Sequence, residues 1–167
     1  MVKAATQAAF TSHMIAVEHV RVSSSLAFAE VRHRLEQTLP LLDASIAAAL
    51  RSGDAERARD YEETGPKLSI FEQRDHGSLL EIFGGRRNAL QYEIGNPLTA
   101  SKMTRYQPCA ALYAPLRVVL FEDEQGRGAF EYDKPSSLFS QYGDDRVSKV
   151  GRYLDGALEA ALRRAAE

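Results

Sequence analysis

Two adjacent residues, Asp75 and His76, could carry out acid–base chemistry. An imidazole titrates near neutral pH, and a nearby carboxylate can hold it in the orientation that a general acid or base needs. The same residues, followed by Gly77, are also typical of a polar turn between two strands. Neighbouring side chains in such a turn often point apart. The pattern therefore gives a catalytic candidate, with a plain turn as the alternative.

A permanent charge interrupts the apolar run Leu116–Phe121 at Arg117. Burying an unpaired guanidinium is costly, so Arg117 must meet a carboxylate, solvent or an anionic ligand. One hypothesis is a cleft for a small polar or anionic ligand, and the other is an ion pair with a glutamate or a charge at a sheet edge. The candidate ligand-binding residues are Asn96, Arg105, Tyr106 and Arg117, and the candidate ion-pair partners are Glu93, Glu122 and Glu131.

A second, weaker anion site is possible at Arg86 and Arg87, which follow two glycines. Backbone N–H groups and guanidinium groups together can receive a phosphate or carboxylate. The spacing is not that of a phosphate-binding loop ending in Gly-Lys-Ser/Thr. The alternative is a solvated corner of the chain.

Other chemistries find little support in the residues. The histidines lack metal-binding spacing, so we expect no metal and no cofactor. Ser136-Ser137 lies outside a Gly-x-Ser-x-Gly elbow, which argues against a hydrolase. Cys109 is the single cysteine, and we expect a buried small side chain there, not a nucleophile.

Composition narrows the class of protein. The 167 residues are 44% hydrophobic, enough for one domain with a core. A net charge of −2 and a pI of about 6.1 argue against a nucleic-acid partner. No apolar run approaches the roughly 20 residues of a membrane span, so we expect no membrane partner either. One cysteine suits the cytoplasm. We expect residues 1–14 to be an extension that contains either a tag or an alternative start, and residues 15–167 to be a single domain.

Hydrophobic periodicity predicts the elements that position these residues. The stretch Asn88–Asp123 is predicted as strand, turn, short helix, loop and strand. Helices are predicted from Ser23–Ser25 to about Leu39, over residues 40–51 and 55–63, at Ser136–Gln141, and from Asp144 or Asp145 to Arg164. Strands are predicted at residues 15–22, 68–74, 78–83, 89–94, 116–121 and 129–133.

Runs of strands joined by short turns favour an α+β fold with an antiparallel sheet of five to six strands. We expect an N-terminal helical segment and the C-terminal helix to cover one face of it. Tyr92, Phe130 and Tyr132 could then lie on the other face, against a partner or a ligand. An uncovered face or edge favours pairing with another chain, most simply in a homodimer.

Four ordered segments, HGSLLEIFGG, ALQYEIGNPLTASKMT, ALYAPLRVVLFED and EYDKPSSLFSQYGD, resemble the DUF302 family of unknown function. The resemblance extends over about residues 15–162. It implies an α+β fold related to the TATA-binding-protein-like architecture and a dimer, and it implies no activity. The helical part around residues 40–66 is longer than in short relatives, which indicates an insertion that could cover a site or an interface.

This chain departs from the resemblance at two positions. Short relatives often carry Cys-Asn-Pro where this chain has Gly95-Asn96-Pro97, and Pro-Cys-Asn where it has Pro115-Leu116-Arg117. Thiol chemistry is therefore not transferable to this chain.

The sequence favours a small cytoplasmic binding protein for a polar or anionic ligand. It leaves two alternatives open. One is an enzyme in which His76 and Asp75 act as acid and base while Arg117 stabilises an anion. The other is a protein–protein interaction module without a small-molecule ligand. No complete catalytic signature is present, so enzyme activity is left undecided.

Overall fold

The computed structural model describes residues 8–167, and the chain alternates between helical and extended segments. The predicted extension therefore falls partly outside the described residues, and residues 8–18 form neither helix nor strand. The elements are β1 His19–Ala27, α1 Phe28–Thr38, α2 Ala44–Ser52, α3 Ala55–Thr64, β2 Ser69–Asp75, the 3₁₀ helix η1 Ser78–Phe83, β3 Ala89–Gly95, α4 Pro97–Thr104, η2 Pro108–Tyr113, β4 Leu116–Glu122, β5 Arg127–Asp133, α5 Pro135–Phe139, η3 Ser140–Tyr142 and α6 Asp145–Ala166.

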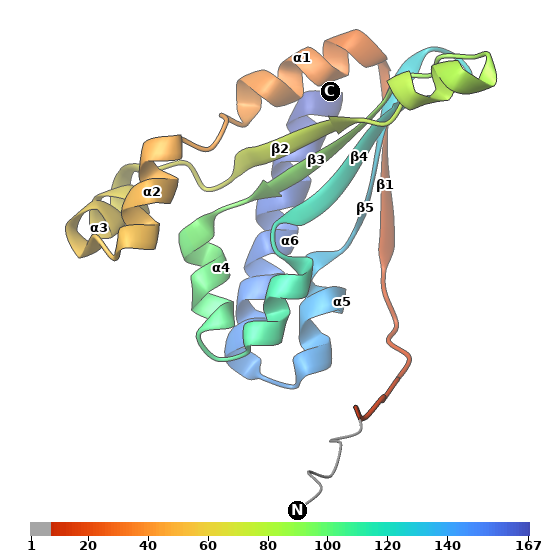
Figure 1. The fold of residues 1–167 in the computed structure, drawn as a ribbon. Helices are drawn as coiled ribbons and strands as arrows, with labels where there is room; N and C mark the ends of the chain where they lie inside the picture. The colour runs from red at the N-terminus through yellow and green to blue at the C-terminus, as the bar shows by residue number, and fades with distance from the viewer. Residues whose placement is uncertain (1–7) are drawn as a thin grey trace, which may run out of the picture.

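The five strands form one antiparallel sheet in the order β1-β5-β4-β3-β2. In Figure 1 the long helix α6 passes behind the sheet, α1 crosses its upper end, and α2 and α3 lie beyond the β2 edge. The expected α+β fold is confirmed, with five strands. The central stretch is also confirmed, because β3, α4, η2 and β4 follow in the predicted order.

The sheet has one buried face, which packs against α1 and α6 and forms the core. Alternate residues of the central strands point into it, as period-two side-chain geometry requires. Tyr92, Phe130 and Tyr132 are buried here, so the expectation that they lie on the other face is wrong. The Tyr92 hydroxyl donates to Glu36 Oε1 at 3.0 Å, which gives the core tyrosine a polar partner on α1. Burial raises the pKa of Tyr92.

The helix α6 supplies the largest apolar stripe. Asp144 caps its first turn by accepting from the Arg146 N–H at 2.9 Å. The hydrogen bond from the Arg146 guanidinium lowers the pKa of Asp144 to about 2. The predicted stripe is confirmed, because Val147, Leu154 and Leu158 are buried at helical spacing.

The other face of the sheet carries charge, and no helix of residues 8–167 packs on it. We call it the open face. Glu72 on β2 lies opposite Glu93 on β3, and Glu93 lies opposite Arg117 on β4. Arg74 is two residues after Glu72 on β2. Arg74 binds Glu93 at 2.7 Å. Further charged side chains of this face lie on β1 and β5, and they include His19, Arg21, Glu131 and Asp133.

The N-terminal strand differs from the prediction at both ends. β1 begins at His19 instead of Ile15, and it continues through Ser23–Ser25, which were predicted to start a helix. Serine hydroxyls suit either role, and here tertiary contacts decide. The Ser24 hydroxyl accepts from the Leu26 N–H and donates to the Ala166 carbonyl at the end of α6, which holds this segment extended.

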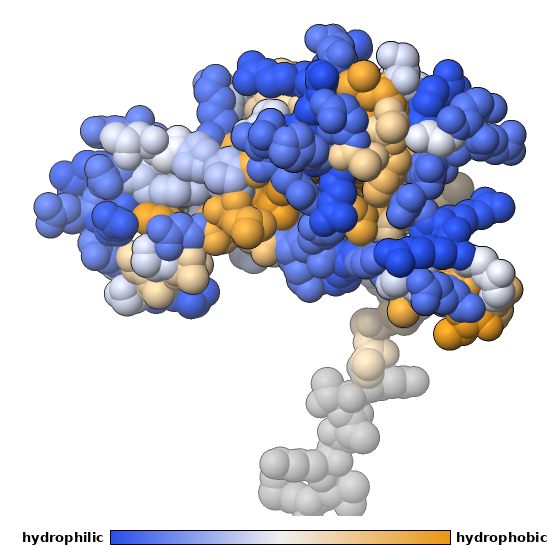
Figure 2. Space-filling model, turned by 90° about the horizontal axis from the view of Figure 1, so that it is seen from above, coloured by the Kyte–Doolittle hydropathy of each residue, from blue (hydrophilic) through white to orange (hydrophobic). Residues whose placement is uncertain are grey.

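The strand predicted at Ser78–Phe83 is wrong, because this segment is η1. Its apolar residues Leu79, Leu80, Ile82 and Phe83 do not alternate with polar ones, and the Asp75 carboxylate accepts from the Ser78 N–H at 3.0 Å. Leu79, Ile82 and Phe83 are 62%, 81% and 82% exposed. Figure 2 shows hydrophobic surface at this corner, at the lower right.

We expect Leu158→Ala to lower the free energy of unfolding by about 2–5 kcal/mol, because it leaves a cavity in a fully buried site between α6 and the sheet. Chemical denaturation measures the change. Arg152→Ala, at an exposed position of the same helix, is the matched control and should stay near wild type. An unchanged midpoint for Leu158→Ala would contradict this packing.

Candidate functional site

Asn96 joins three segments of the chain at the end of β3. Its side-chain oxygen accepts from the backbone N–H groups of Leu98 and Thr99 at 2.9 and 3.0 Å and so caps α4. Its side-chain amide donates to the Pro66 carbonyl at 3.0 Å. Pro97 takes the first helical position, where a missing N–H costs nothing. Asn96 therefore ties the segment after α3 to the start of α4.

A cleft of about 590 Å³ opens beside Asn96, and we call it the Asn96 cleft. Its walls come from α3, the connection to β2, the first turns of α4 and the outer surface of α6. Tyrosine rings and aliphatic side chains make up much of the lining. The lining residues are Tyr61, Glu62, Gly65, Pro66, Lys67, Asn96, Leu98, Thr99, Lys102, Lys149, Val150 and Tyr153.

The Asn96 cleft carries excess positive charge. Lys67, Lys102 and Lys149 line it together with one glutamate. Lys102 Nζ binds Glu62 Oε1 at 2.5 Å. Within the described part of the chain, Lys67 and Lys149 have no carboxylate within 4.0 Å. Two ammonium groups at one apolar-walled cleft are therefore available to an anion.

Tyr61 lines the cleft with its side chain and carries a buried hydroxyl. Its side chain is 7% exposed, and its buried hydroxyl has no hydrogen-bond partner among the described residues. Gly65 approaches it so closely that a Cβ there would lie 2.7 Å from the Tyr61 ring. A buried hydroxyl without a partner costs free energy.

The other predicted ligand-binding residues do not meet at this cleft. Arg117 is exposed on the open face, opposite a Glu93 that already binds Arg74. Arg105 and Tyr106 follow α4, where the Tyr106 ring lies 3.7 Å from the Arg146 guanidinium and 5.0 Å from that of Arg105. The four predicted ligand-binding residues therefore do not form one cluster. Of the four, Asn96 alone borders the Asn96 cleft.

The predicted acid–base pair is not formed. Asp75 is engaged in capping η1 through Ser78, and no hydrogen bond joins it to His76, which is exposed. The histidine that does meet carboxylates is His19, whose Nδ1 lies 3.0 Å from Asp133 Oδ1 and whose Nε2 lies 3.4 Å from Glu131 Oε2. The hydrogen bond with Asp133 raises the pKa of His19.

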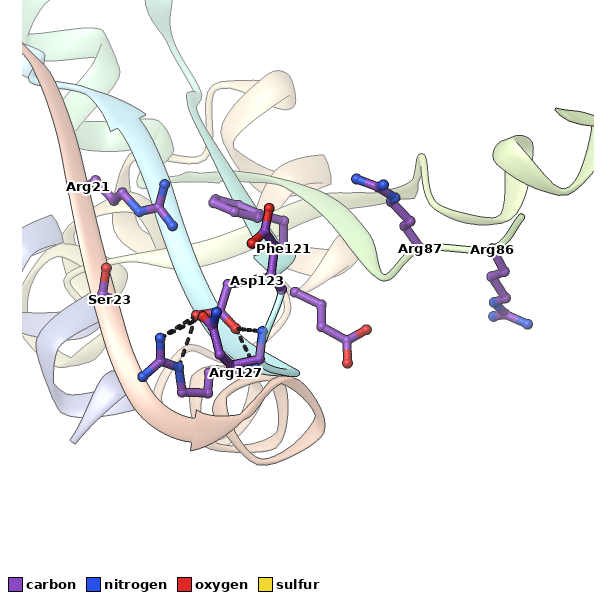
Figure 3. Close-up of a pocket in the computed structure, with 10 residues that line it drawn as sticks. Arg21, Ser23, Arg86, Arg87, Phe121, Asp123 and Arg127 are labelled. Atoms are coloured by element: carbon purple, nitrogen blue, oxygen red, sulfur yellow. Dashed lines mark hydrogen bonds and ion pairs between the residues drawn. The ribbon is translucent and has the colours of Figure 1, made fainter. Parts of the chain in front are cut away.

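Arginines gather in a second hollow, of about 650 Å³, at the upper end of the open face. Arg21 lies over the Phe121 ring at 5.0 Å, and Arg127 is held by Asp123 at 2.9 Å. Figure 3 shows Arg86 and Arg87 pointing in opposite directions. They therefore do not form the predicted two-pronged anion site, although both border this hollow.

We rank the Asn96 cleft above the arginine hollow for ligand binding. Ligand sites are mostly apolar with a few placed polar groups. In the hollow, Arg21, Arg86 and Arg127 already have carboxylates within 3.5 Å. In the Asn96 cleft, by contrast, Lys67 and Lys149 have no carboxylate this close among the described residues.

Two smaller expectations concern metals and the thiol. Among the described residues no group of three or more potential ligands could hold a metal ion. Cys109 is exposed, so the expected buried side chain is wrong. η2 turns Ala110 inward, and Cys109 is held through its backbone carbonyl, which accepts from the Tyr142 hydroxyl at 2.8 Å.

Comparison with known families identifies the chain. The model of a domain of unknown function, DUF302, matches residues 56–165, which is more than half of the sequence. The chain belongs to the DUF302 family. The resemblance in the four sequence segments is thus confirmed, and all four lie wholly within the match.

One solved DUF302 structure shows a similar fold. The crystal structure of an uncharacterized conserved DUF302 protein from Bacillus stearothermophilus matches with a TM-score of 0.64. The match covers 88% of this chain and 97% of that one at 17% identity, so it supports the fold alone. No curated protein matches. Membership in DUF302 therefore supplies the fold and no activity.

Sequence reasoning missed most of the Asn96 cleft. Asn96 itself was predicted as a ligand-binding candidate, but its role as the cap of α4 was not. Tyr61, Lys67 and Lys149 come from three segments, and only the tertiary structure brings them together.

We expect Asn96→Ala to lower the free energy of unfolding by about 1–2 kcal/mol, because it removes the cap of α4 and the bond to Pro66. Thermal unfolding with van't Hoff analysis measures the loss. Asn88→Ala is the matched control, since the exposed Asn88 makes a side-chain bond to Glu122 in a surface loop. Equal stability of the two variants would argue against the capping role.

Proposed function

We propose that this DUF302 protein binds a small anionic ligand with an apolar part in the Asn96 cleft. The observation that carries the proposal is the pair of ammonium groups of Lys67 and Lys149, which border one apolar-walled cleft and have no carboxylate within 4.0 Å among residues 8–167. A carboxylate or phosphate would gain charge-assisted hydrogen bonds from them. Tyr153 and Val150 offer apolar surface to the rest of the ligand.

The helical segment between α1 and β2 contributes one side of this site. α3 provides Tyr61 and Glu62, and the following connection provides Gly65, Pro66 and Lys67. This supports the idea that the expected insertion around residues 40–66 covers a ligand site.

An enzymatic role has less support than binding. The candidate pair Asp75 and His76 is not hydrogen-bonded, and neither residue borders the Asn96 cleft. Arg117, the proposed anion stabiliser of that reaction, lies on the open face opposite Glu93. Asp75, His76 and Arg117 therefore do not share one site at which they could act on the same substrate.

A second copy of the chain is the proposed partner, and the open face is the proposed contact. No helix packs on this face, in contrast to the face under α6. It presents arginines and carboxylates in alternation, and a two-fold axis can bring one sign opposite the other. Arg117 has no carboxylate within 4.0 Å in residues 8–167. The cytoplasm remains our proposed location, consistent with the exposed thiol of Cys109.

We expect Lys149→Met to abolish most of the thermal stabilisation that small carboxylates and phosphates give the wild-type protein. The substitution removes one of the two unpaired ammonium groups of the cleft and keeps a long aliphatic side chain. A thermal-shift screen of these anions, followed by calorimetric titration of the best one, measures the effect.

Arg117→Met is the matched control, since it removes one positive charge from the open face. Tyr61→Phe should leave the unliganded protein equally or more stable, because it removes an unpaired buried hydroxyl. A loss of affinity in that variant would show that the ligand uses the hydroxyl. If Arg117→Met or Arg87→Met loses the anion response while Lys149→Met keeps it, the site is elsewhere.

We expect light scattering at micromolar concentration to give about twice the chain mass of 18.5 kDa. Arg117→Glu should shift the protein toward the monomer, because it places like charges together on the open face. Arg152→Glu, on the exposed surface of α6, is the control and should leave the mass unchanged. A wild-type monomer at every concentration would refute the dimer.

A further inference from the structure

The corner formed by residues 78–87 is built as a projecting tip on a closed base. Both His76 and Gly77 donate their backbone N–H groups to the Ala89 carbonyl at 3.0 Å. Gly77 is packed so tightly that a Cβ there would lie 1.8 Å from the Arg87 carbonyl oxygen. The two ends of the segment are thus held together where it leaves the sheet. We call this segment the η1 tip.

Beyond that base the η1 tip stands clear of the molecule. A Cβ added to Gly84 or Gly85 would meet no atom within 4 Å. Gly84 adopts a φ of 85°, in the left-handed region, and ends η1. The chain then turns back toward β3. Figure 1 shows the segment extending past the upper end of the strands. The apolar side chains are therefore presented on a convex surface.

Three large apolar side chains gather on this convex surface, namely Leu79, Ile82 and Phe83, all more than 60% exposed. Figure 2 shows the hydrophobic patch with hydrophilic surface beside it. Surface of this kind commonly marks a contact with a protein or a membrane. A single exposed apolar residue needs no explanation, but here Leu79 and Ile82 are three residues apart, on one side of the 3₁₀ helix, and Phe83 follows directly.

Positive charge lies directly beside the patch. Arg86 and Arg87 follow the two glycines, and the one acidic residue in the segment, Glu81, is 3.5 Å from Arg86. Arg87 has no carboxylate within 4.0 Å among residues 8–167. Apolar side chains flanked by arginines are the composition of segments that lie at the interface of anionic bilayers.

We propose that the η1 tip is a docking surface for an anionic lipid bilayer. Leu79, Ile82 and Phe83 enter the interface, and Arg86 and Arg87, which point in opposite directions, contact separate phosphate and carboxylate headgroups. A convex tip suits a deformable surface, whereas a protein partner would need a matching groove. The contact is peripheral: within residues 8–167 no helix is long and apolar enough to cross a bilayer. The expectation of no membrane partner was based on spanning segments, and peripheral docking requires none.

Vesicle co-sedimentation of the full chain tests the proposal, with phosphatidylcholine vesicles that contain or lack phosphatidylserine. We expect binding to the anionic vesicles and weaker binding at high salt. The double variant Ile82→Ser/Phe83→Ser should lose about tenfold or more in affinity, since two buried apolar side chains are removed. Arg86→Gln and Arg87→Gln should each lose about fivefold on anionic vesicles.

The matched control is Leu112→Ser, which removes a leucine that is 73% exposed in η2, outside the η1 tip. It should bind as wild type does. Thermal unfolding should be unchanged in every variant, because the altered side chains are exposed. Absence of wild-type binding to anionic vesicles, or equal losses in Leu112→Ser and Ile82→Ser/Phe83→Ser, would overturn the proposal. A changed molecular mass of the double variant would do so too, since the tip would then be an interface between copies.

Discussion

Packing of α6 against one face of the sheet is the contact on which the rest of the structure depends. A β-strand sends alternate side chains to opposite faces, so sealing one face fixes the chemistry of both. Tyr92, Val118, Leu120 and Phe130 fill the sealed side. Their neighbours in sequence are thereby placed on the open face, where arginines and carboxylates accumulate. The outer surface of α6 then becomes a wall of the Asn96 cleft.

The fold was predictable where a single period extends over a long segment. The stripe of α6 and the alternation in β3 gave the correct elements because burial on one side dominates them. Prediction failed at η1, where a strand-length apolar run is exposed, and at Ser23–Ser25, where the contact with Ala166 decides the conformation. Neither cause is visible in local sequence.

The site was predictable to a smaller extent. Arg117 stood out in the sequence because it interrupts the nearly continuous apolar run Leu116–Phe121. In the sheet, Leu116, Val118 and Leu120 point inward, so Arg117 simply occupies an outward position. The capping role of Asn96 has a local signature, so it could have been predicted. The lysines of the Asn96 cleft could not, since exposed lysines are common and their convergence depends on how α3, α4 and α6 pack.

The closed base at Gly77 has a consequence for how this family can diversify. The backbone contacts of Gly77 and Ala89 join the two ends of the segment before it leaves the sheet. Substitutions and changes of length between them therefore impose little strain on the strands that follow. Residues 78–87 can therefore change in sequence and length, and with them the surface of this corner, while the sheet and its helices stay the same.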